Sequence, residues 1–328
     1  MAARILHAEG AEREASLQAV CEELERGGVV ALPTETVYGL AGNALNASAA
    51  ARIFEAKERP FFDPLICHIP DLGWLDKITS LPPSLQPLVE RLATSFWPGP
   101  LTLVLPKNAC IPDLVSSGLP TVAVRWSAHP LFQAVLSRFN RPLAAPSANR
   151  FGRISPTTAA HVLEELGGKI PLILDGGPAL HGLESTIIAP VACGLRILRS
   201  GPITREQLEE HAPVLENEAL QEGEDRPEAP GQLKSHYAPR TPLFLFPTGE
   251  APPPEAHAAL LAWQQAPPGF GAQEVLSPSG DLREAAARLF AALRRLDESG
   301  LHRIHAELVP HTGLGIAIND RLQRAAAR

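Results

Sequence analysis

The sequence predicts an α/β protein made of two units that follow each other along the chain. Strand-like and helix-like segments alternate over residues 1–212, which favours a twisted sheet covered by helices. A second alternation of the same kind begins at Thr241, and the acidic stretch from Glu216 to Ala229 between them lacks apolar periodicity. The 328 residues also suffice for two domains of about 100–200 residues each. We therefore expect a first domain over 1–212, a linker over 213–240 and a second domain over 241–328.

The helices of the first domain are expected from apolar spacing and from their end signals. Leu17, Val20, Cys21 and Leu24 are spaced i, i+3, i+4, i+7, and a glycine pair stops the helix. Further helices are expected over 47–57, 85–96 and 131–139. Ser155 and Pro156 are expected to open another helix, as N-cap and first helical residue.

The strands of the first domain are expected where short apolar runs are rich in Val, Leu, Ile and Thr. These runs are 29–32, 65–69, 101–105, 121–126, 143–145, 172–174, 186–188 and 195–198. In the second domain the pattern predicts a strand over 243–246, a helix over 256–264, an amphipathic helix over 282–296, a strand over 304–309 and a helix after Gly315. The order is βαβα, so the second domain is expected to be a small α/β unit.

Composition narrows the classes of function. The formal net charge of −7 argues against a protein that coats nucleic acid, because phosphate backbones are bound by clustered Lys and Arg. No apolar run approaches the roughly 20 residues that span a bilayer, and the charged start of the chain lacks a signal-peptide core. The four cysteines form no CxxC pair, and the histidines show no metal-ligand spacing. We expect a cytoplasmic protein with no protein-bound metal site.

Familiar catalytic signatures are absent, and polar residues at strand ends stand out instead. There is no GxxxxGK[ST] phosphate loop, no GxSxG elbow and no complete dinucleotide fingerprint. The segment 33–40 follows a strand directly; its hydroxyls either bind a small polar ligand or only stabilise a turn. Lys57 and Arg59 come at the end of a helix, where cations either cap the helix or grip phosphates.

The strand over 121–125 is more informative. Period-two alternation puts Thr121, Ala123 and Arg125 on one face. An arginine is almost never buried without a partner, so Arg125 pairs either with a carboxylate of the protein or with the carboxylate of a ligand. Ser147 and Ser155 are expected beside a helix N-terminus, which can bind an anion or simply be capped.

Taken together, these segments resemble one family. The segments PTETVYGL, KERPFFDPLICHI, WPGPLT, TVAVR, APSANRFGRISPT, GLESTII and ILRSGPIT are similar to the successive motifs of YrdC-like threonylcarbamoyl-AMP synthases. PGQLKSHYAP and GLGIAINDRLQRAA resemble the longer, two-domain branch. The resemblance covers most of residues 15–240 and recurs near the C-terminus. It implies a YrdC-like twisted, mixed, open sheet with helices, followed by a linker and a smaller Rossmann-like domain.

The resemblance also implies the reaction. The family condenses L-threonine, bicarbonate and ATP to threonylcarbamoyl-AMP and releases pyrophosphate; Mg²⁺ is expected with the ATP. A partner transferase then passes the threonylcarbamoyl group to adenosine in tRNA. Carbamate chemistry of this kind needs alignment and charge stabilisation rather than a nucleophilic triad. It also needs protection from water, so the linker is interpreted as a lid.

Site residues are carried over by position. Lys57, Arg59, Ser147 and Asn149 match the family's KxR…SxN pattern, and Lys57 and Arg59 are taken as catalytic. Contacts to ATP are implied for Arg59, Asp63, Thr121, Ser147, Asn149, Ser155, Arg199, His236 and Tyr237. Contacts to threonine are implied for Thr36, His68, Arg125, Ala145 and Ser185.

The sequence departs from the family pattern at three places. Asp63 stands where many relatives have Asn, so this acid either contacts ATP or helps to hold a metal. The linker reads Gln-Leu-Lys-Ser over 232–235 where relatives often read Met-Lys-Tyr-Arg, which leaves open whether Lys234, His236 or Tyr237 touches the nucleotide. Asp320 replaces a frequent Asn.

Two other classes of protein fit less well. A nucleic-acid-binding regulator is disfavoured by the negative charge, so no strong direct binding of nucleic acid is expected. Another carbamoyl-adenylate-forming enzyme, such as the carbamoyltransferase that matures hydrogenases, would carry zinc-finger modules, and the CxxC pairs for these are missing.

Overall fold

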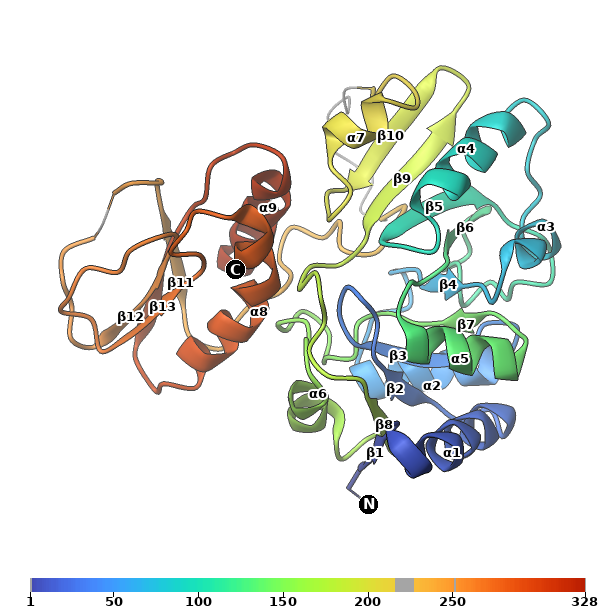
Figure 1. The fold of residues 1–328 in the computed structure, drawn as a ribbon, viewed down its shortest axis with the longest axis horizontal. Coiled ribbons are helices and arrows are strands. Elements are labelled where there is room, and N and C mark those ends of the chain that lie inside the picture. The colour runs from blue at the N-terminus through green and yellow to red at the C-terminus, as the bar shows by residue number, and fades with distance from the viewer. Residues whose placement is uncertain (1, 216–226, 251, 328) are drawn as a thin grey trace.

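The computed structural model describes residues 2–215, 227–250 and 252–327, which form two sheets (Figure 1). The strands of the first sheet are β1 (Arg4–His7), β2 (Val30–Leu32), β3 (Gly39–Asn43), β4 (Ile66–His68), β5 (Leu101–Pro106), β6 (Thr121–Arg125), β7 (Leu143–Ala144), β8 (Leu172–Asp175), β9 (Thr186–Val191) and β10 (Gly194–Arg199). They are ordered β1-β8-β2-β3-β7-β4-β6-β5-β9-β10, with both parallel and antiparallel neighbours. This is the mixed, twisted sheet that the sequence predicts.

Helices cover both faces of one half of this sheet and one face of the other half. They are α1 (Arg13–Glu25), α2 (Ala47–Lys57), α3 (Leu75–Ile78), α4 (Gln86–Phe96), α5 (Pro130–Phe139), α6 (Ala159–Leu166) and α7 (Arg205–Glu209), with 3₁₀ turns η1 (Gly10–Glu12) and η2 (Leu72–Trp74). Side chains on a strand alternate between faces. Accordingly Val30 and Leu32 pack with α1 and α5, whereas Val29 and Ala31 belong to the core under α2 and α6.

The other half of the sheet, around β4, β6, β5 and β9, is covered by helices on one face only. Its second face carries a small apolar cluster that includes Ile66, Ala123 and Ile187, and Ala229 from the linker packs onto it. A linker segment without a helix therefore covers part of this face. This leaves a polar recess between strand ends and linker.

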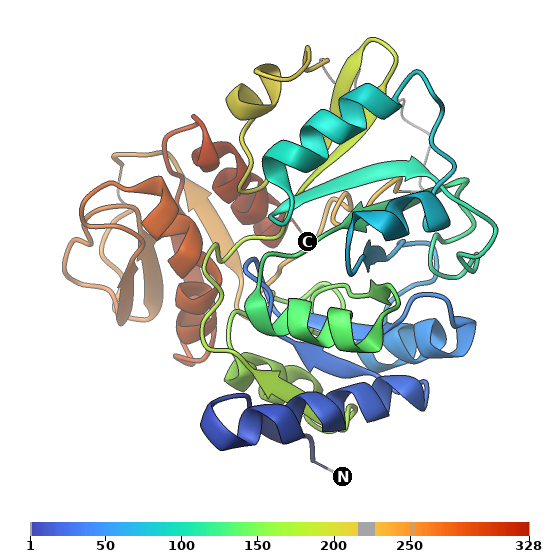
Figure 2. The same cartoon turned by 45° about the vertical axis from the view of Figure 1, so that its right-hand side comes forward.

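The second unit is a four-stranded parallel sheet ordered β11-β14-β12-β13. Its elements are β11 (Leu243–Phe246), β12 (Ala258–Ala262), β13 (Ala272–Val275), α8 (Leu282–Asp297), β14 (Arg303–Glu307) and α9 (Leu314–Ala326). Helices α8 and α9 lie on the side that faces the first unit (Figures 1 and 2). The boundaries proposed for the domains from the sequence stay a prediction, and the acidic stretch 216–226 lies outside the described residues.

Two predicted elements are wrong. The segment 256–264 contains strand β12 rather than a helix, and all five residues of that strand are buried. A short apolar run buried on both sides cannot be told from a helix by periodicity, and its Ala and Leu content favoured the helix. The helix expected from Ser155 begins at Ala159 instead, with Thr158 as the N-cap that accepts a hydrogen bond from the amide of His161. Ser155 lies in a buried extended stretch before it.

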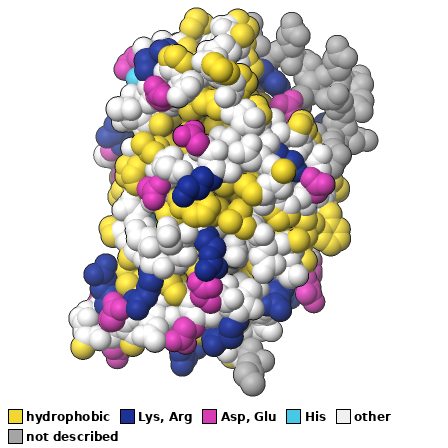
Figure 3. Space-filling model, turned by 90° about the vertical axis from the view of Figure 1, so that its right-hand side faces the viewer, with side chains coloured by type: hydrophobic (Ala, Val, Ile, Leu, Met, Phe, Trp, Pro, Cys, Tyr) yellow, Lys and Arg dark blue, Asp and Glu magenta, His cyan; other side chains and the backbone are white. Residues whose placement is uncertain are grey.

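The surface charges and the helix lengths bear on two classes that the composition disfavours, nucleic-acid-coating proteins and membrane-spanning proteins. In Figure 3, Lys and Arg side chains on the face shown are interspersed with Asp and Glu rather than gathered into a stripe. Within the described residues, none of the helices is both long and apolar enough to cross a membrane.

Candidate active site

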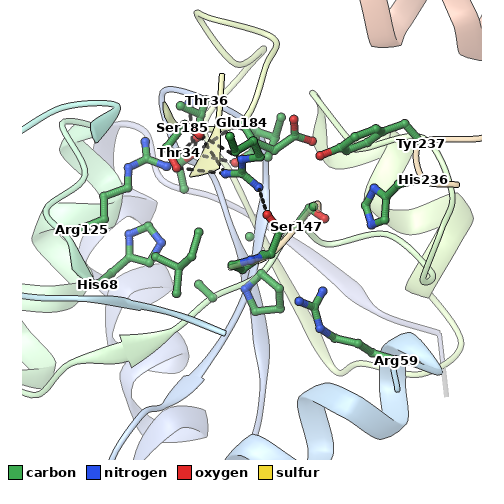
Figure 4. A pocket seen from close by; sticks show the side chains of 18 residues that line it. Thr34, Thr36, Arg59, His68, Arg125, Ser147, Glu184, Ser185, His236 and Tyr237 are labelled. Carbon is green, nitrogen blue, oxygen red and sulfur yellow. Dashed lines mark hydrogen bonds between the residues drawn. The ribbon is translucent and has the colours of Figure 1, made fainter. Parts of the chain in front are cut away.

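A small cavity of about 40 Å³ lies between the strand ends of the first sheet and the linker (Figure 4). Residues far apart in the chain meet there. Its lining consists of Thr34, Thr36, Val37, Gly39, Arg59, Ile66, His68, Arg125, Ala145, Pro146, Ser147, Glu184, Ser185, Arg199, Pro230, Gly231, His236 and Tyr237. Most of the residues predicted for ATP and threonine are therefore brought together around one cavity.

Arg125 and His68 form one end of the cavity. They lie opposite each other on the parallel strands β6 and β4. The Arg125 guanidinium donates from Nη1 to Thr36 Oγ1 at 2.8 Å and from Nε to the Gly99 carbonyl at 3.2 Å. Its Nη2 lies 2.7 Å from a carboxylate oxygen of Glu35. Of the two partners that the sequence allowed for Arg125, a carboxylate of the protein is therefore present.

Glu35 stays ionised although it is buried. Burial raises its pKa, but Arg125, the amide of Ala128 and the hydroxyl of Ser127 together lower the pKa to about 2. The charge of Arg125 is thereby balanced inside the protein. The guanidinium nevertheless lines the cavity and can still donate toward it.

His68 is a neutral imidazole. Burial, followed by the nearby Arg125 cation, lowers its pKa to about 3. Its ring packs against Phe132 with centroids 4.8 Å apart, and among the described residues its Nδ1 has no hydrogen-bond partner. A buried polar atom without a partner is uncommon in a folded protein and indicates a place for a polar ligand.

Arg199 and Arg59 form the other end. Arg199 donates from Nε and Nη2 to the Ser185 carbonyl at 3.1 and 3.0 Å, and from Nη1 to the Pro230 carbonyl at 3.3 Å. Arg59 donates to the carbonyl of Pro64 at 2.8 Å and lies 2.9 Å from an oxygen of Asp63. Burial lowers the pKa of both arginines. Three buried guanidinium groups thus converge on one small space, which suits an anionic ligand.

Five predicted residues do not line the cavity. Lys57 donates from Nζ to the carbonyls of Ser147 and Asn149, both at 2.6 Å, and so lies behind the Ser147 turn. Asn149 donates to the carbonyl of Arg150 at 2.8 Å. Asp63 is fully buried against Arg59, and burial raises its pKa while Arg59 opposes the rise.

The remaining two are held elsewhere. Thr121 begins β6, half-buried and outside the cavity lining. Ser155 donates its hydroxyl to a carboxylate oxygen of Glu184, which does line the cavity. Direct contacts of these residues with ATP stay predictions. Lys57, Asp63 and Ser155 contact Ser147, Arg59 and Glu184, which line the cavity.

The linker closes the recess. Tyr237 is 1% exposed, has a positive φ of 64° and lines the cavity beside His236. The two rings lie 4.1 Å apart between centroids. Gly231, at a φ of 82°, lies so close that a Cβ there would be 2.8 Å from the Tyr237 hydroxyl. Lys234 is exposed and does not line the cavity.

Two polar atoms of the linker face the cavity without partners. Within the described part of the chain, the Tyr237 hydroxyl and His236 Nδ1 make no hydrogen bond. Burial, together with the surrounding Arg and Lys charges, holds the pKa of His236 well below its usual value. A space of about 40 Å³ is far below the roughly 300–1,000 Å³ of pockets that bind small ligands. A nucleotide therefore fits only if residues that line the cavity move.

Several residues at or behind this site were not among those carried over from the family pattern. Thr34 belongs to the segment 33–40, whose hydroxyls the sequence offered for a polar ligand, and Glu35 lies in the same turn. Glu184 precedes Ser185, so its neighbour in sequence could have indicated it. Arg321 of α9 bonds to Glu184 from the second unit at 2.9 Å, and nothing in its local sequence signals this contact. In the described ranges no group of three or more His, Cys, Asp or Glu could hold a metal ion.

Comparison with known proteins identifies the family. A family model described as "Telomere recombination" matches residues 22–201, and one described as "Threonylcarbamoyl-AMP synthase, C-terminal domain" matches 203–327. Threonylcarbamoyl-AMP synthase of Bacillus subtilis is 40% identical over 322 residues, covering 92% of this chain and 90% of the relative. That of Pyrococcus abyssi is 39% identical over 317 residues and 92% of each chain.

A solved structure extends the likeness to the whole fold. The crystal structure of P. abyssi Sua5 complexed with L-threonine has a TM-score of 0.88, with 35% identity over 98% of this chain and 97% of that one. With relatives this similar over nearly the full length, and with both family models matching in order, the chain belongs to the threonylcarbamoyl-AMP synthase family.

Proposed function

We propose that this protein is an L-threonylcarbamoyladenylate synthase, a nucleotidyltransferase that joins L-threonine, bicarbonate and ATP. The observation that carries the proposal is the small cavity in which three buried arginines, a neutral histidine and two linker aromatics converge. The two full-length synthases of the same family and the P. abyssi structure that holds L-threonine also support the proposal.

The amino acid would bind at the β4–β6 end. A guanidinium pairs with a carboxylate through parallel hydrogen bonds, so Arg125 is the natural partner of the threonine carboxylate. Thr36 and Ser185 would bind polar groups of threonine, and the main chain near Ala145 lies beside them. The amino group of threonine would then point toward the arginines at the other end. It must first lose its proton, because only the neutral amine can act as a nucleophile.

The nucleotide would bind at the Arg59–Arg199 end. ATP carries about four negative charges, and buried cations offset them more strongly than exposed ones do. Ser147 and the linker residues His236 and Tyr237 would complete this half. Lys57 would act on the nucleotide through the Ser147 turn that it holds, and Ser155 through Glu184.

The reaction would need alignment rather than a protein nucleophile. The threonine amine attacks bicarbonate, water leaves, and N-carboxythreonine results. An oxygen of its new carboxylate attacks the α-phosphorus of ATP, and the bond to pyrophosphate breaks. Mg²⁺ arrives as part of the ATP substrate and offsets phosphate charge. The acids at the site, Glu35, Asp63 and Glu184, already pair with Arg125, Arg59 and Arg321, so none is placed as a free metal ligand.

The linker would act as a lid over a labile intermediate. Closure excludes water from the carbamate, and opening admits substrates and releases product. The two unpartnered linker atoms, the Tyr237 hydroxyl and His236 Nδ1, are free to bond to the nucleotide when it enters.

The product would serve a transferase that modifies adenosine in tRNA to threonylcarbamoyladenosine. That partner and a cytoplasmic location are expectations from the reaction itself, since its ATP and its tRNA are found there. Strong direct binding of nucleic acid is not expected, given the net charge of −7.

Pyrophosphate release from ATP tests the proposal. The protein should release pyrophosphate when L-threonine and bicarbonate are both present, and only at background level when either is omitted. Equal release without threonine would point to another carbamoyl-adenylate-forming activity. Salt-dependent RNA binding with no turnover would favour a regulator instead.

A further inference from the structure

Arg321 of α9 is a buried cation at which the second unit reaches the wall of the cavity. Its side chain is 0% exposed. The guanidinium donates from Nε to Glu184 Oε2 at 2.9 Å and from Nη2 to the Ser200 carbonyl at 2.9 Å, both in the first unit. Its remaining nitrogen, Nη1, bonds to Asp320 of its own helix at 2.6 Å. Two nitrogens of the planar fork thus connect the two units, and the third holds the guanidinium to its own helix.

The two contacts in the first unit flank residues that line the cavity. Glu184 directly precedes Ser185, and Ser200 directly follows Arg199. Ser185 and Arg199 are themselves joined by hydrogen bonds from the guanidinium to the Ser185 carbonyl and hydroxyl. Arg321 therefore holds the outer neighbours of this pair and fixes the distance between the two chain segments that present it.

The same side chain also supports the lid. The Arg321 Cζ lies 5.1 Å from the ring centroid of Tyr237, and the ring stacks on Phe290 of α8 at 5.6 Å. One turn further along α9, Arg324 bonds to the Leu233 carbonyl and accepts, through its own carbonyl, the amide of His236 at 3.2 Å. Through Arg321 and Arg324, helix α9 therefore contacts both the segments at the ends of β9 and β10 and the linker.

Arg294 of α8 provides a matched comparison. It is also a buried arginine, 6% exposed, and it also crosses between the units, where it bonds to the Ile154 carbonyl and lies 3.2 Å from Glu165. None of these partners lines the cavity. Loss of Arg294 would therefore weaken the contact between the units while leaving the hydrogen bonds of Arg321 to Glu184 and Ser200 in place.

We propose that Arg321 is a positioning residue for the synthase reaction, through which the second unit sets the placement of Ser185, Arg199 and the Tyr237 lid. The inference rests on the proposed function for its catalytic consequence. Lysine cannot replace Arg321, because a single ammonium lacks the planar fork that reaches Glu184, Ser200 and Asp320 at once.

The test compares the full-length variants Arg321→Met, Arg321→Lys and Arg294→Met. Each is measured for melting temperature, for L-threonine affinity by calorimetry without ATP, and for KM and kcat of pyrophosphate release. Both Met variants should melt at lower temperature. Only the Arg321 variants should lose affinity for L-threonine and drop in kcat/KM, by roughly 10–100-fold, as expected when a support of the site is removed. Arg294→Met should stay within about threefold of wild type in kcat/KM.

Two results would overturn the proposal. One is that Arg321→Lys stays within about threefold of wild type in both L-threonine affinity and kcat/KM. The other is that Arg294→Met loses as much of both as the Arg321 variants do, which would reduce Arg321 to a general stabiliser. If Arg321→Met does not fold, Arg321→Lys decides. If the wild type binds L-threonine but releases no pyrophosphate, the proposed function fails, while the calorimetry still tests Arg321.

Discussion

At the scale of single residues, the site is built from buried charges that balance one another. Arg125 pairs with Glu35, Arg59 with Asp63, and Arg321 with Glu184. Removing one partner of such a pair leaves an uncompensated charge in the interior, which typically costs about 3–5 kcal/mol. A variant of one of these residues therefore changes both ligand binding and folding stability, and a control variant is needed to separate the two effects.

Glu35→Gln should make the protein less sensitive to acid while lowering its stability at neutral pH. The pKa of Glu35 is lowered from 4.5 to about 2 in the folded state, so the unfolded state binds the proton first as pH falls. The stabilisation is fully present above about pH 4.5 and is lost as pH falls toward 2; it amounts to about 3 kcal/mol. Unfolding free energies measured between pH 2 and 7 check this.

Because burial also lowers the pKa of His68 and His236, the wild type should start to lose stability already near pH 6.5. That loss should remain in Glu35→Gln, so only the part below about pH 4.5 is diagnostic. An unchanged slope in that lower range would show that Glu35 is not ionised in the folded protein.

Arg59→Ala should cost about 2–4 kcal/mol of transition-state stabilisation, because it removes a preorganised cation from the phosphate end. It also strands the buried Asp63 carboxylate. The double variant Arg59→Ala with Asp63→Asn removes that second effect, so it should recover stability but not activity. Recovery of kcat/KM to within about threefold of wild type in the double variant would argue against a phosphate contact.

At the scale of elements, the cavity depends on short strands whose ends converge and on a linker that replaces a helix. Amphipathic helices such as α1 and α5 could be predicted, since their apolar spacing follows the side that they bury. β12 could not, because its Ala and Leu residues are buried on both sides and carry no period. Nor could Ser155, whose hydroxyl serves Glu184, distant in sequence, rather than the local helix.

Gly231→Ala should disturb the closed linker and little else. The residue has a φ of 82°, and the added Cβ would lie 2.8 Å from the Tyr237 hydroxyl and 3.1 Å from Cδ of Arg199. Strain of about 1–2 kcal/mol at the positive φ adds to this clash. We expect faster proteolytic cleavage of the linker and a reduced kcat/KM, with a melting temperature close to wild type.

Gly249→Ala is the matched control. It also has a positive φ, 79°, but no atom of the described residues lies within 4 Å of the added Cβ. If both glycine variants lower kcat/KM equally, backbone strain rather than closure of the linker explains the loss.

At the scale of the whole molecule, the second unit completes the site from outside. The resemblance found in the sequence predicted which segments meet, because motif residues such as Thr36, Arg125 and Arg199 line one cavity. It could not predict contacts between units, such as Arg321 to Glu184, since these depend on how α9 docks against the first sheet. The first unit nevertheless has cores of its own, formed by residues up to Val214.

A chain cut before Pro230 should therefore fold but lose most activity. It keeps the first sheet with its helices and loses Tyr237, His236 and Arg321. Circular dichroism should show a cooperative melt, whereas kcat/KM should fall by roughly 100-fold or more. Turnover at the full-length rate would mean that the linker is only a tether.

The most direct measurement of the central claim follows isotopically labelled bicarbonate into the product. On the proposed function, threonine, bicarbonate and ATP meet under the linker in one cavity. Incubation of the full-length protein with all three should give threonylcarbamoyl-AMP that carries the label, seen by mass spectrometry, in equal amount to the pyrophosphate released. Pyrophosphate released without a labelled adenylate containing threonine would contradict it.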